Sequence, residues 1–325
     1  MNHAVALHSI TKTFGPKIAV SDLHLEIPEG SLTGFIGPNG AGKTTTIRMI
    51  MSIIFPDSGE LSVLGKASAV ESKDRIGYLP EERGVYKKMR VLAFLEYMAR
   101  LKGIDGAGLT ATVLQWLARV GLADSARKKC EELSKGMQQK VQYIAAVIHQ
   151  PDLIILDEPF SGLDPVNSRL LRELIDEQHN AGRTIIFSTH QMLQAEALCD
   201  RIVMIHQGQK VLDDSPQTIR GRFAPHSLAV EFDSEPPLEA LRKVGAVADL
   251  GRWLEVRPPG PPASVLPALA LLPGLRRVEV LSPTLEDIFI SIVERSGGTV
   301  DPATLRAAPI QRKDGPSAEN LNNRG

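Results

Sequence analysis

Cysteine is scarce in this chain of 325 residues, which contains only two. Cys130 and Cys199 lie far apart in the sequence, and neither has neighbours at the spacing of a metal site. This scarcity excludes a disulfide-stapled secreted scaffold and a cysteine-rich zinc module, and it suits a reducing cytoplasm.

Long hydrophobic runs are also missing. No stretch approaches the roughly 20 apolar residues that a membrane-spanning helix needs, and the apolar stretch 265–272 is interrupted by Pro267. The first residues do not follow the basic-then-apolar plan of a signal peptide. We therefore expect any role at a membrane to be carried out through a partner protein.

Neither sign of charge is in excess. The chain has 37 Lys and Arg against 38 Asp and Glu, which gives a formal net charge of −1. Bulk attraction to nucleic acid or to an anionic membrane is thereby excluded as the main basis of binding. The 43% of hydrophobic and 23% of charged residues are typical of a soluble globular protein, and the length allows two domains.

What the sequence does contain is a glycine-rich loop between an apolar run, 32–36, and a helix-like segment, 45–51. The loop has the pattern G-x-x-x-x-G-K-[ST], whose glycines let backbone N–H groups converge on an anion at the start of a helix. A turn that only joins a strand to a helix would not explain the Lys-Thr pair. The predicted triphosphate-binding residues are Gly37, Pro38, Asn39, Gly40, Ala41, Gly42, Lys43, Thr44 and Thr45.

Within this loop, Lys43 can reach the β- and γ-phosphates and the Thr44 hydroxyl can ligate Mg²⁺. A second apolar run, 153–156, ends in Asp157 and Glu158. Carboxylates at the end of a buried parallel strand lie at the ligand-binding edge of an open α/β sheet. Asp157 is predicted to hold Mg²⁺, and Glu158 to orient or deprotonate a water that attacks the γ-phosphate. The alternative is two solvated acids at a strand end.

Polar residues also follow the next apolar strand, 184–188, which leads to His190. A lone histidine after a strand is more often structural, but a place at the same sheet edge as Asp157 favours a role in the chemistry. Between the two strands, Asp164 is predicted to cap the N-terminus of a helix whose first turn begins with Pro165.

Two features lie outside these strands. Ser134 is a good N-cap for a helix that runs to about His149, and Ser134 with Gly136 at an open helix start can also bind an anion. Phe14 lies in a turn between two predicted strands, 4–10 and 18–27. Its position alone fits a base-stacking platform and an ordinary hydrophobic plug equally well.

Together these segments resemble the nucleotide-binding subunits of ABC transporters, over residues 3 to about 220. Five motifs occur in the family's order: the phosphate loop 37–45, an L-S-G-G-Q-like signature at 133–137, the Mg²⁺ strand with its Glu at 153–158, the D-loop at 161–164 and the switch histidine His190. The resemblance implies that Phe14 stacks on adenine and that Asp164 belongs to the nucleotide-binding set. Residues 79–84 look like the branch of bacterial exporters for drugs, sodium and other small solutes.

The resemblance also implies a mechanism. Two copies would pair head to tail around two ATP molecules with Mg²⁺, so that Ser134 and Gly136 of one copy close on the γ-phosphate held by Lys43 of the other. Opening and closing of this dimer would drive a separately encoded membrane permease. The subunit would be bound to that permease at the cytoplasmic face of the membrane.

Two departures from the family pattern concern the groups that would face the phosphates. Glu81 stands where most relatives carry a glutamine; it keeps an oxygen for Mg²⁺, but it adds negative charge and cannot donate a hydrogen bond. The signature has Lys135 for its first Gly and Met137 for its Gln.

The predicted fold class is therefore α/β: a P-loop NTPase (ABC ATPase) core with a helical subdomain and a small antiparallel β subdomain, followed by a small α+β C-terminal domain. The expected boundaries are 1–220 for the nucleotide-binding domain, with a helical insertion at about 85–150, and 227–297 for the accessory domain of split βαβ type. Residues 300–325 are predicted to be a disordered tail.

The leading hypothesis is an ATP-hydrolysing subunit of an exporter that works as a homodimer with permease subunits and without nucleic acid. A soluble ABC-type ATPase acting on nucleic acid or ribosomes is the alternative, but such relatives usually carry tandem cores, a long coiled coil or zinc-binding cysteine pairs. A P-loop kinase would need an acceptor site and would not explain residues 133–137.

Overall fold

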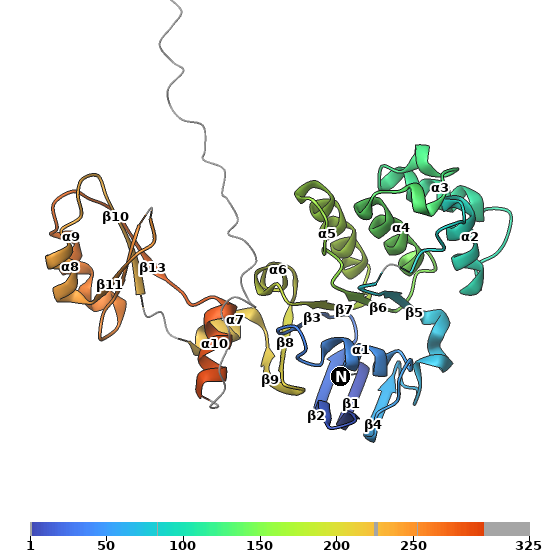
Figure 1. Cartoon of the computed structure of the whole chain (residues 1–325), viewed down its shortest axis with the longest axis horizontal. Coiled ribbons are helices and arrows are strands. Elements are labelled where there is room, and N and C mark those ends of the chain that lie inside the picture. Colours follow the sequence, from blue (N-terminus) through green and yellow to red (C-terminus); the bar gives the residue numbers. More distant parts are fainter. Residues whose placement is uncertain (1, 83, 224–226, 252, 296–325) are drawn as a thin grey trace, which may run out of the picture.

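The computed structural model describes residues 2–82, 84–223, 227–251 and 253–295. A six-stranded sheet lies at its centre, in the order β5-β6-β7-β3-β8-β9 (Figure 1). The strands are β3 (Leu32–Ile36), β5 (Ile76–Leu79), β6 (Leu153–Asp157), β7 (Thr184–Thr189), β8 (Arg201–His206) and β9 (Gln209–Asp214). All neighbours pair in parallel except β8 and β9.

The sheet is covered on both faces, which explains why its central strands are continuous apolar runs. Every residue of β3, β6 and β7 is buried, as a parallel strand between two layers requires. Because β3, β6 and β7 run in the same direction, their carboxyl ends lie at one edge of the sheet. This edge receives the phosphate loop and the predicted carboxylates.

One face is covered by an antiparallel sheet of order β2-β1-β4 together with helix α1 (Lys43–Ile50). Its strands are β1 (His3–Phe14), β2 (Lys17–Pro28) and β4 (Ser58–Val63), and a 3₁₀ segment, η1 (Ala69–Arg75), follows β4. Strand β2 alternates buried and exposed residues along most of its length, as expected for a sheet with one solvated face. Strand β1 is longer than expected, so Phe14 ends a strand rather than lying in a turn.

The other face carries the helices drawn above the sheet in Figure 1. They are α2 (Val91–Leu101), α3 (Leu109–Arg119), α4 (Lys135–Val147), α5 (Pro165–Asn180) and α6 (Met192–Leu198), with short 3₁₀ turns η2 (Ala123–Ser125) and η3 (Cys130–Glu132). Helices α2 to α4 fall within the predicted insertion at 85–150. The buried Tyr143 on α4 donates its hydroxyl to the Leu174 carbonyl on α5 at 2.9 Å, which joins the insertion to the core.

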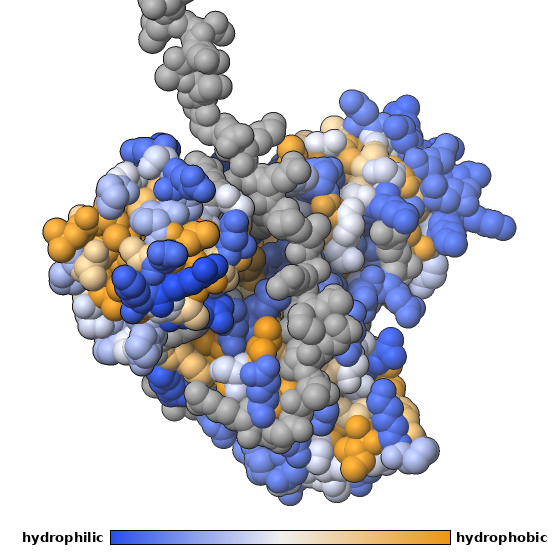
Figure 2. Space-filling view, turned by 60° about the vertical axis from the view of Figure 1, so that its left-hand side comes forward, coloured by the Kyte–Doolittle hydropathy of each residue, from blue (hydrophilic) through white to orange (hydrophobic). Residues whose placement is uncertain are grey.

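A second unit follows, built on a four-stranded sheet of order β11-β12-β10-β13. Its elements are β10 (Ser227–Phe232), α8 (Leu238–Val244), β11 (Ala246–Asp249), β12 (Leu254–Arg257), η4 (Pro262–Val265), α9 (Leu266–Ala270) and β13 (Leu275–Leu281). The unit has its own apolar cluster, which includes Leu228, Leu241 and Leu269. On the face seen in Figure 2, strongly hydrophilic and hydrophobic residues are interspersed over this unit.

The last helix belongs to the nucleotide-binding core and not to the small unit with which the sequence groups it. Helix α10 (Leu285–Arg295) follows β13 but contacts α6. Its buried residues Leu285, Ile288, Phe289 and Val293 join the large apolar cluster of the core, and the Phe289 ring meets the His206 ring edge-on at 5.4 Å. An amphipathic pattern predicts a helix, but it does not say which apolar surface the helix covers.

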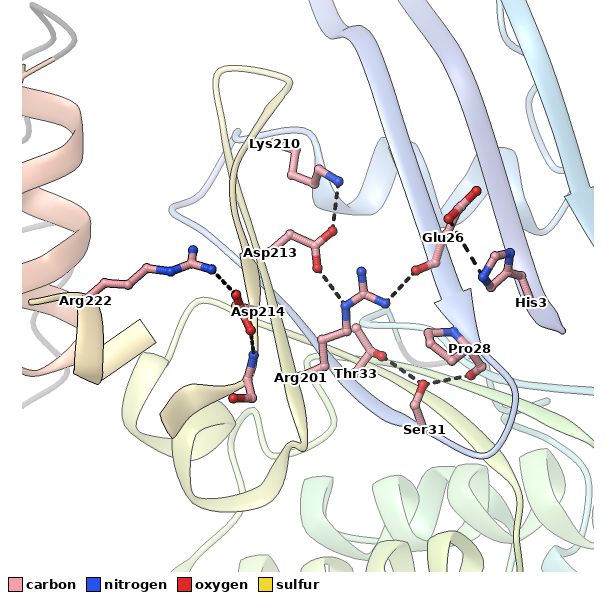
Figure 3. A network of polar contacts seen from close by, with 11 residues as sticks. His3, Glu26, Pro28, Ser31, Thr33, Arg201, Lys210, Asp213, Asp214 and Arg222 are labelled. Atoms are coloured by element: carbon pink, nitrogen blue, oxygen red, sulfur yellow. Dashed lines mark hydrogen bonds and ion pairs between the residues drawn. The ribbon is translucent and has the colours of Figure 1, made fainter. Parts of the chain in front are cut away.

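A polar network joins the antiparallel sheet to the edge of the central sheet (Figure 3). Arg201 on β8 binds the Asp213 carboxylate on β9 at 2.6 Å and the Glu26 carbonyl on β2 at 2.8 Å. Arg222, at the end of α7 (Pro216–Arg222), pairs with Asp214 at the end of β9. The network therefore fixes the two sheets and α7 relative to one another.

None of the helices in the described ranges combines the length and apolar character needed to cross a bilayer. Residues 296–325, which include the stretch predicted to be disordered, lie outside the described residues, as do residues 224–226 between the two expected domains.

Candidate functional site

A cavity of about 400 Å³ lies at the carboxyl end of β3. It brings together the phosphate loop, the tip of the β1–β2 hairpin, the end of β6 and the loop after β5. The lining residues are Phe14, Lys17, Ala19, Asn39, Gly40, Ala41, Gly42, Lys43, Thr44, Thr45, Glu81 and Glu158.

Two glycines of the phosphate loop are required by its geometry. A Cβ on Gly37 would lie 2.2 Å from the Ile205 carbonyl oxygen, and one on Gly42 would lie 2.6 Å from that of Ala19. Gly42 also has φ of 109° as it begins α1, a conformation that a side chain disfavours. The loop can therefore pass this close to neighbouring backbone only as glycine, and its N–H groups precede a helix N-terminus, where an anion is favoured.

Lys43, the first residue of α1, is folded back into the loop. Its Nζ donates to the carbonyl oxygens of Gly37 at 2.7 Å and Pro38 at 3.2 Å. Burial lowers the pKa of this ammonium, and the carboxylates of Glu158 and Asp157 oppose that shift. The loop thus contains a cation held by two neutral oxygens, which a phosphate oxygen can replace with a stronger charged contact.

Asp157 ends β6 with a buried carboxylate that lacks a partner. Neither oxygen has a hydrogen bond among the described residues. The pKa of this carboxyl is raised to about 6, chiefly by burial and also by the carboxylates of Glu81 and Glu158, while the nearby Ser188 hydroxyl opposes the shift. Unpartnered buried polar atoms are rare in native proteins, and a carboxylate of this kind beside a phosphate loop is suited to bind an ion or water.

These residues fit Mg²⁺ in one respect that the structure shows. Asp157, Glu81 and the Thr44 side chain line a second hollow, of about 380 Å³, next to the first. Mg²⁺ prefers oxygen ligands and is usually bound through one or two carboxylates plus phosphates and water. No group of three or more His, Cys, Asp or Glu able to hold a metal unaided is present in the described ranges, so the triphosphate would have to supply ligands.

Glu158 is held in a defined orientation by the residues after β7. Its Oε1 accepts from the His190 backbone N–H at 2.8 Å and lies 2.7 Å from His190 Nδ1, while Oε2 accepts from the Thr189 hydroxyl at 3.2 Å. The hydrogen bond to Glu158 raises the pKa of His190. Glu158 also has φ of 48°, an unfavourable backbone conformation for a non-glycine residue, which is typical of functional sites.

Three predicted nucleotide-binding residues lie elsewhere. Ser134 caps α4 by accepting from Met137 N–H at 3.3 Å, and Asp164 caps α5 by accepting from Asn167 N–H at 2.8 Å. Gly136 lies next to Leu163. None of the three lines the cavity that contains the phosphate loop, so a single copy of the chain, as far as it is described, does not bring them to that cavity.

A larger hollow, of about 900 Å³, lies between β9, α7 and α10. It contains none of the predicted site residues, and its lining mixes charges of both signs, including Lys210, Arg222 and Asp287. Size therefore does not identify the reactive site of this protein; the converging carboxylates and the lysine do.

Comparison with known proteins agrees with this geometry. A family model described as "ABC transporter" matches residues 20–161. The YhaQ protein of Bacillus subtilis (strain 168), described as an uncharacterized ABC transporter ATP-binding protein, is 40% identical over 298 residues, which cover 89% of this chain and 98% of that protein. The chain belongs to the ABC transporter ATP-binding proteins.

Further relatives support the assignment of this chain to the ABC transporter ATP-binding proteins. The Nod factor export ATP-binding protein I of Cupriavidus metallidurans is 32% identical over 305 residues, covering 91% of this chain and 99% of its own. A solved structure described as the ATP binding subunit of an ABC transporter is 29% identical with a TM-score of 0.63, covering 67% of this chain and 92% of that one. The predicted fold is confirmed, and so is the predicted ATPase activity, since this family hydrolyses ATP to drive transport.

Three residues of this site are not predicted from the sequence. Lys17 lines the cavity because it lies opposite Phe14 in the hairpin, a relation that the pairing register of the hairpin could have revealed. Thr189 binds Glu158, and its place beside His190 was the available signal. Tyr78, in the hollow with Asp157, has a pKa raised to about 12, chiefly by burial; no motif indicated it.

Asp157→Asn is expected to stabilise the protein when Mg²⁺ and nucleotide are absent. The pKa of this carboxyl rises from 3.8 to about 6 on folding, so the folded state holds the proton more tightly and stability falls as pH rises from about 4 to 6. Above pH 6 the native carboxylate costs up to about 3 kcal/mol, by the value of one pKa unit, and the amide escapes this cost.

Thermal unfolding in EDTA at pH 4.5 and pH 7.5 measures the effect. The unfolding midpoint of the variant should exceed that of the native protein by more at pH 7.5 than at pH 4.5. Glu173→Gln, at an exposed ion pair on α5, is the control. An equal or smaller midpoint for Asp157→Asn at pH 7.5 would contradict the assignment of an unsatisfied charge.

Proposed function

We propose that this subunit binds Mg²⁺–ATP at residues 37–45 and hydrolyses it with Glu158 as the general base. The observation that carries the proposal is the Glu158 carboxylate, which lines the cavity of the phosphate loop while His190 and Thr189 hold both of its oxygens. A general base must be positioned before it can act within hydrogen-bond reach of its proton.

Binding uses the two ends of the cavity. Phe14 provides a ring for the purine base, and the phosphate loop provides backbone N–H groups and the Lys43 ammonium for the β- and γ-phosphates. Thr44, Asp157 and Glu81 would hold Mg²⁺, which neutralises charge on the phosphates when bound. The stacked base and the loop together fix the direction in which the triphosphate points.

In hydrolysis, Glu158 takes a proton from the water that attacks the γ-phosphorus, and the bond from that phosphorus to the β-phosphate oxygen breaks. Lys43 lies in the same cavity and stabilises the charge on the leaving oxygens. His190 keeps the carboxylate in place, because its side chain and its backbone N–H both bind the same Glu158 oxygen.

The active form is a head-to-tail dimer. Ser134 and Gly136 lie at the start of α4, a 13-residue helix whose N-terminus favours an anion. Their absence from the cavity of their own chain supports a role at the cavity of a second copy. Asp164 would act beside them, since Gly136 adjoins Leu163 in the loop before α5.

The partner is a separately encoded permease of an exporter, at the cytoplasmic face of the membrane. Relatives named for Nod factor export and for linearmycin resistance support export as the direction. Exposed apolar side chains support the contact: Ile53 lines the hollow of Glu81, and the exposed Tyr86 and Tyr97 rings, after β5 and on α2, pack edge-on at 5.8 Å. A permease covering this surface could sense the ligands of the site through Glu81.

Glu158→Gln should retain ATP binding and lose hydrolysis by at least about a hundredfold, the lower limit for removing a general base. The amide oxygen can still accept from the His190 backbone N–H, and the amide NH2 can donate to the Thr189 hydroxyl oxygen, so the site keeps its shape. ATPase rate and equilibrium binding of ATP are the measurements, with Glu173→Gln as the surface control. Retention of full turnover would exclude Glu158 as the base.

Ser134→Arg should leave ATP binding by the monomer unchanged and prevent closure of the dimer. The large cation replaces a small cap at the proposed trans contact but lies outside the nucleotide cavity of its own chain. Size-exclusion chromatography of the Glu158→Gln protein in ATP, with and without Ser134→Arg, reports the dimer. A normal ATPase rate in the Ser134→Arg protein would contradict the trans arrangement.

Purification of the native complex tests the partner. We expect the subunit to copurify with a protein that contains several apolar spans of about 20 residues, and Tyr86→Asp with Tyr97→Asp to reduce its recovery. The exposed Leu114→Asp on α3 is the matched control. Equal recovery with all variants would remove this surface from the proposal.

A further inference from the structure

The tip of the β1–β2 hairpin, which carries Phe14, is irregular. The register between β1 and β2 shifts on both sides of Lys12, and β1 pairs with β4 only as far as Thr11 opposite Ser58. Register shifts of this kind re-aim side chains and free backbone groups from the ladder. Within the described residues, no strand pairs with residues 12–14 on the β4 side.

The side chain of Asp57 takes the place of that missing strand. Asp57 immediately precedes β4, and its backbone N–H donates to the Thr11 carbonyl at 2.8 Å. Its Oδ2 accepts from both the N–H and the hydroxyl of Thr13 at 2.7 Å, and its Oδ1 accepts from Lys12 Nζ at 2.7 Å. The hydrogen bonds from Lys12 and then from Thr13 lower the pKa of this carboxyl to about 2, so it is ionised at neutral pH.

The same carboxylate determines what lies over the Phe14 ring. Lys12 Nζ lies 5.6 Å from the centroid of that ring, within the range of a cation–π contact. Phe14 is 51% exposed, so packing alone does not restrain its side chain. Asp57 binds the ammonium from one side and the Thr13 backbone, the residue before Phe14, from the other.

We propose that Asp57 is a positioning residue for the purine base of the nucleotide. It holds residues 12–14 so that the Phe14 ring faces the cavity before ATP arrives, although Asp57 does not itself line that cavity. Pre-organising a ring in its binding orientation reduces the conformational entropy lost on binding. This inference rests on the proposed stacking role of Phe14.

The test compares a ligand that has a base with one that lacks it. Asp57→Ala should weaken ATP binding about three- to tenfold, part or all of the effect of losing a stacked aromatic ring. Its affinity for inorganic triphosphate, which engages only the phosphate loop, should stay within about twofold of native, because the loop is not altered. In steady-state kinetics the KM for ATP should rise, while kcat, measured at saturating ATP, should not change.

A double variant separates positioning from general structural damage. Adding Asp57→Ala to Phe14→Ala should produce no further loss of ATP affinity, because the ring that Asp57 positions is gone. Thr13→Val, which removes one of the three hydrogen bonds and keeps the carboxylate, should show a smaller loss of the same kind. Glu60→Ala, at an exposed acid on β4, is the matched control.

The outcomes distinguish positioning of the Phe14 ring by Asp57 from a general structural role of Asp57. Equal weakening of ATP and inorganic triphosphate, or an additive loss in the double variant, would overturn the positioning role and leave Asp57 a structural residue. A native affinity for ATP in Asp57→Ala while Phe14→Ala is weakened would also overturn it. A native affinity in Phe14→Ala would instead overturn the stacking that the inference assumes.

Discussion

The structure depends on how buried carboxylates are satisfied at one sheet edge. Glu81, Asp157 and Glu158 converge near the Lys43 ammonium, and Lys17 and Arg48 line the two adjoining hollows. The protein satisfies Glu158 through His190 and Thr189, but it leaves both oxygens of Asp157 buried without partners in the described structure. Buried charges are costly unless they are paired. The edge is therefore built to be completed by a ligand that brings positive charge.

The rest of the fold holds this edge still. Apolar clusters cover both faces of the central sheet, so β3 and β6 deliver the phosphate loop and the carboxylates from rigid strands. The hairpin that carries Phe14 comes from a different sheet, and the Gly208 backbone joins it to the phosphate loop. The Gly208 carbonyl accepts from the Ser21 N–H on β2 at 3.0 Å, and its N–H donates to the Ala41 carbonyl at 2.8 Å.

The sequence predicts the phosphate loop and its carboxylates well because parallel strands end at one edge of a sheet. A continuous apolar run followed by Asp157-Glu158 fixes both the strand and its ligand end. It does not predict Asp57, because a side chain that replaces a strand partner at a bulge has no sequence pattern. It places α10 in the wrong unit, since the spacing of Leu285, Ile288 and Phe289 predicts a buried face without identifying what buries it.

Glu81 shows how this cluster of carboxylates bears on the choice of ligand. A glutamine there would leave two carboxylates near Lys43, whereas the glutamate makes three and raises the pKa of Asp157. A free triphosphate would add further negative charge to this edge, and repulsion at short range in a partly buried site is severe. A triphosphate already carrying Mg²⁺ brings much less net charge and supplies the cation that the Asp157 oxygens lack. If Mg²⁺ binds as proposed, Glu81 would favour nucleotide entering as its metal complex and would couple the loop after β5 to the bound cation. That loop adjoins the exposed apolar surface at Ile53, so the residue that departs from the family pattern lies between the nucleotide and the proposed permease contact.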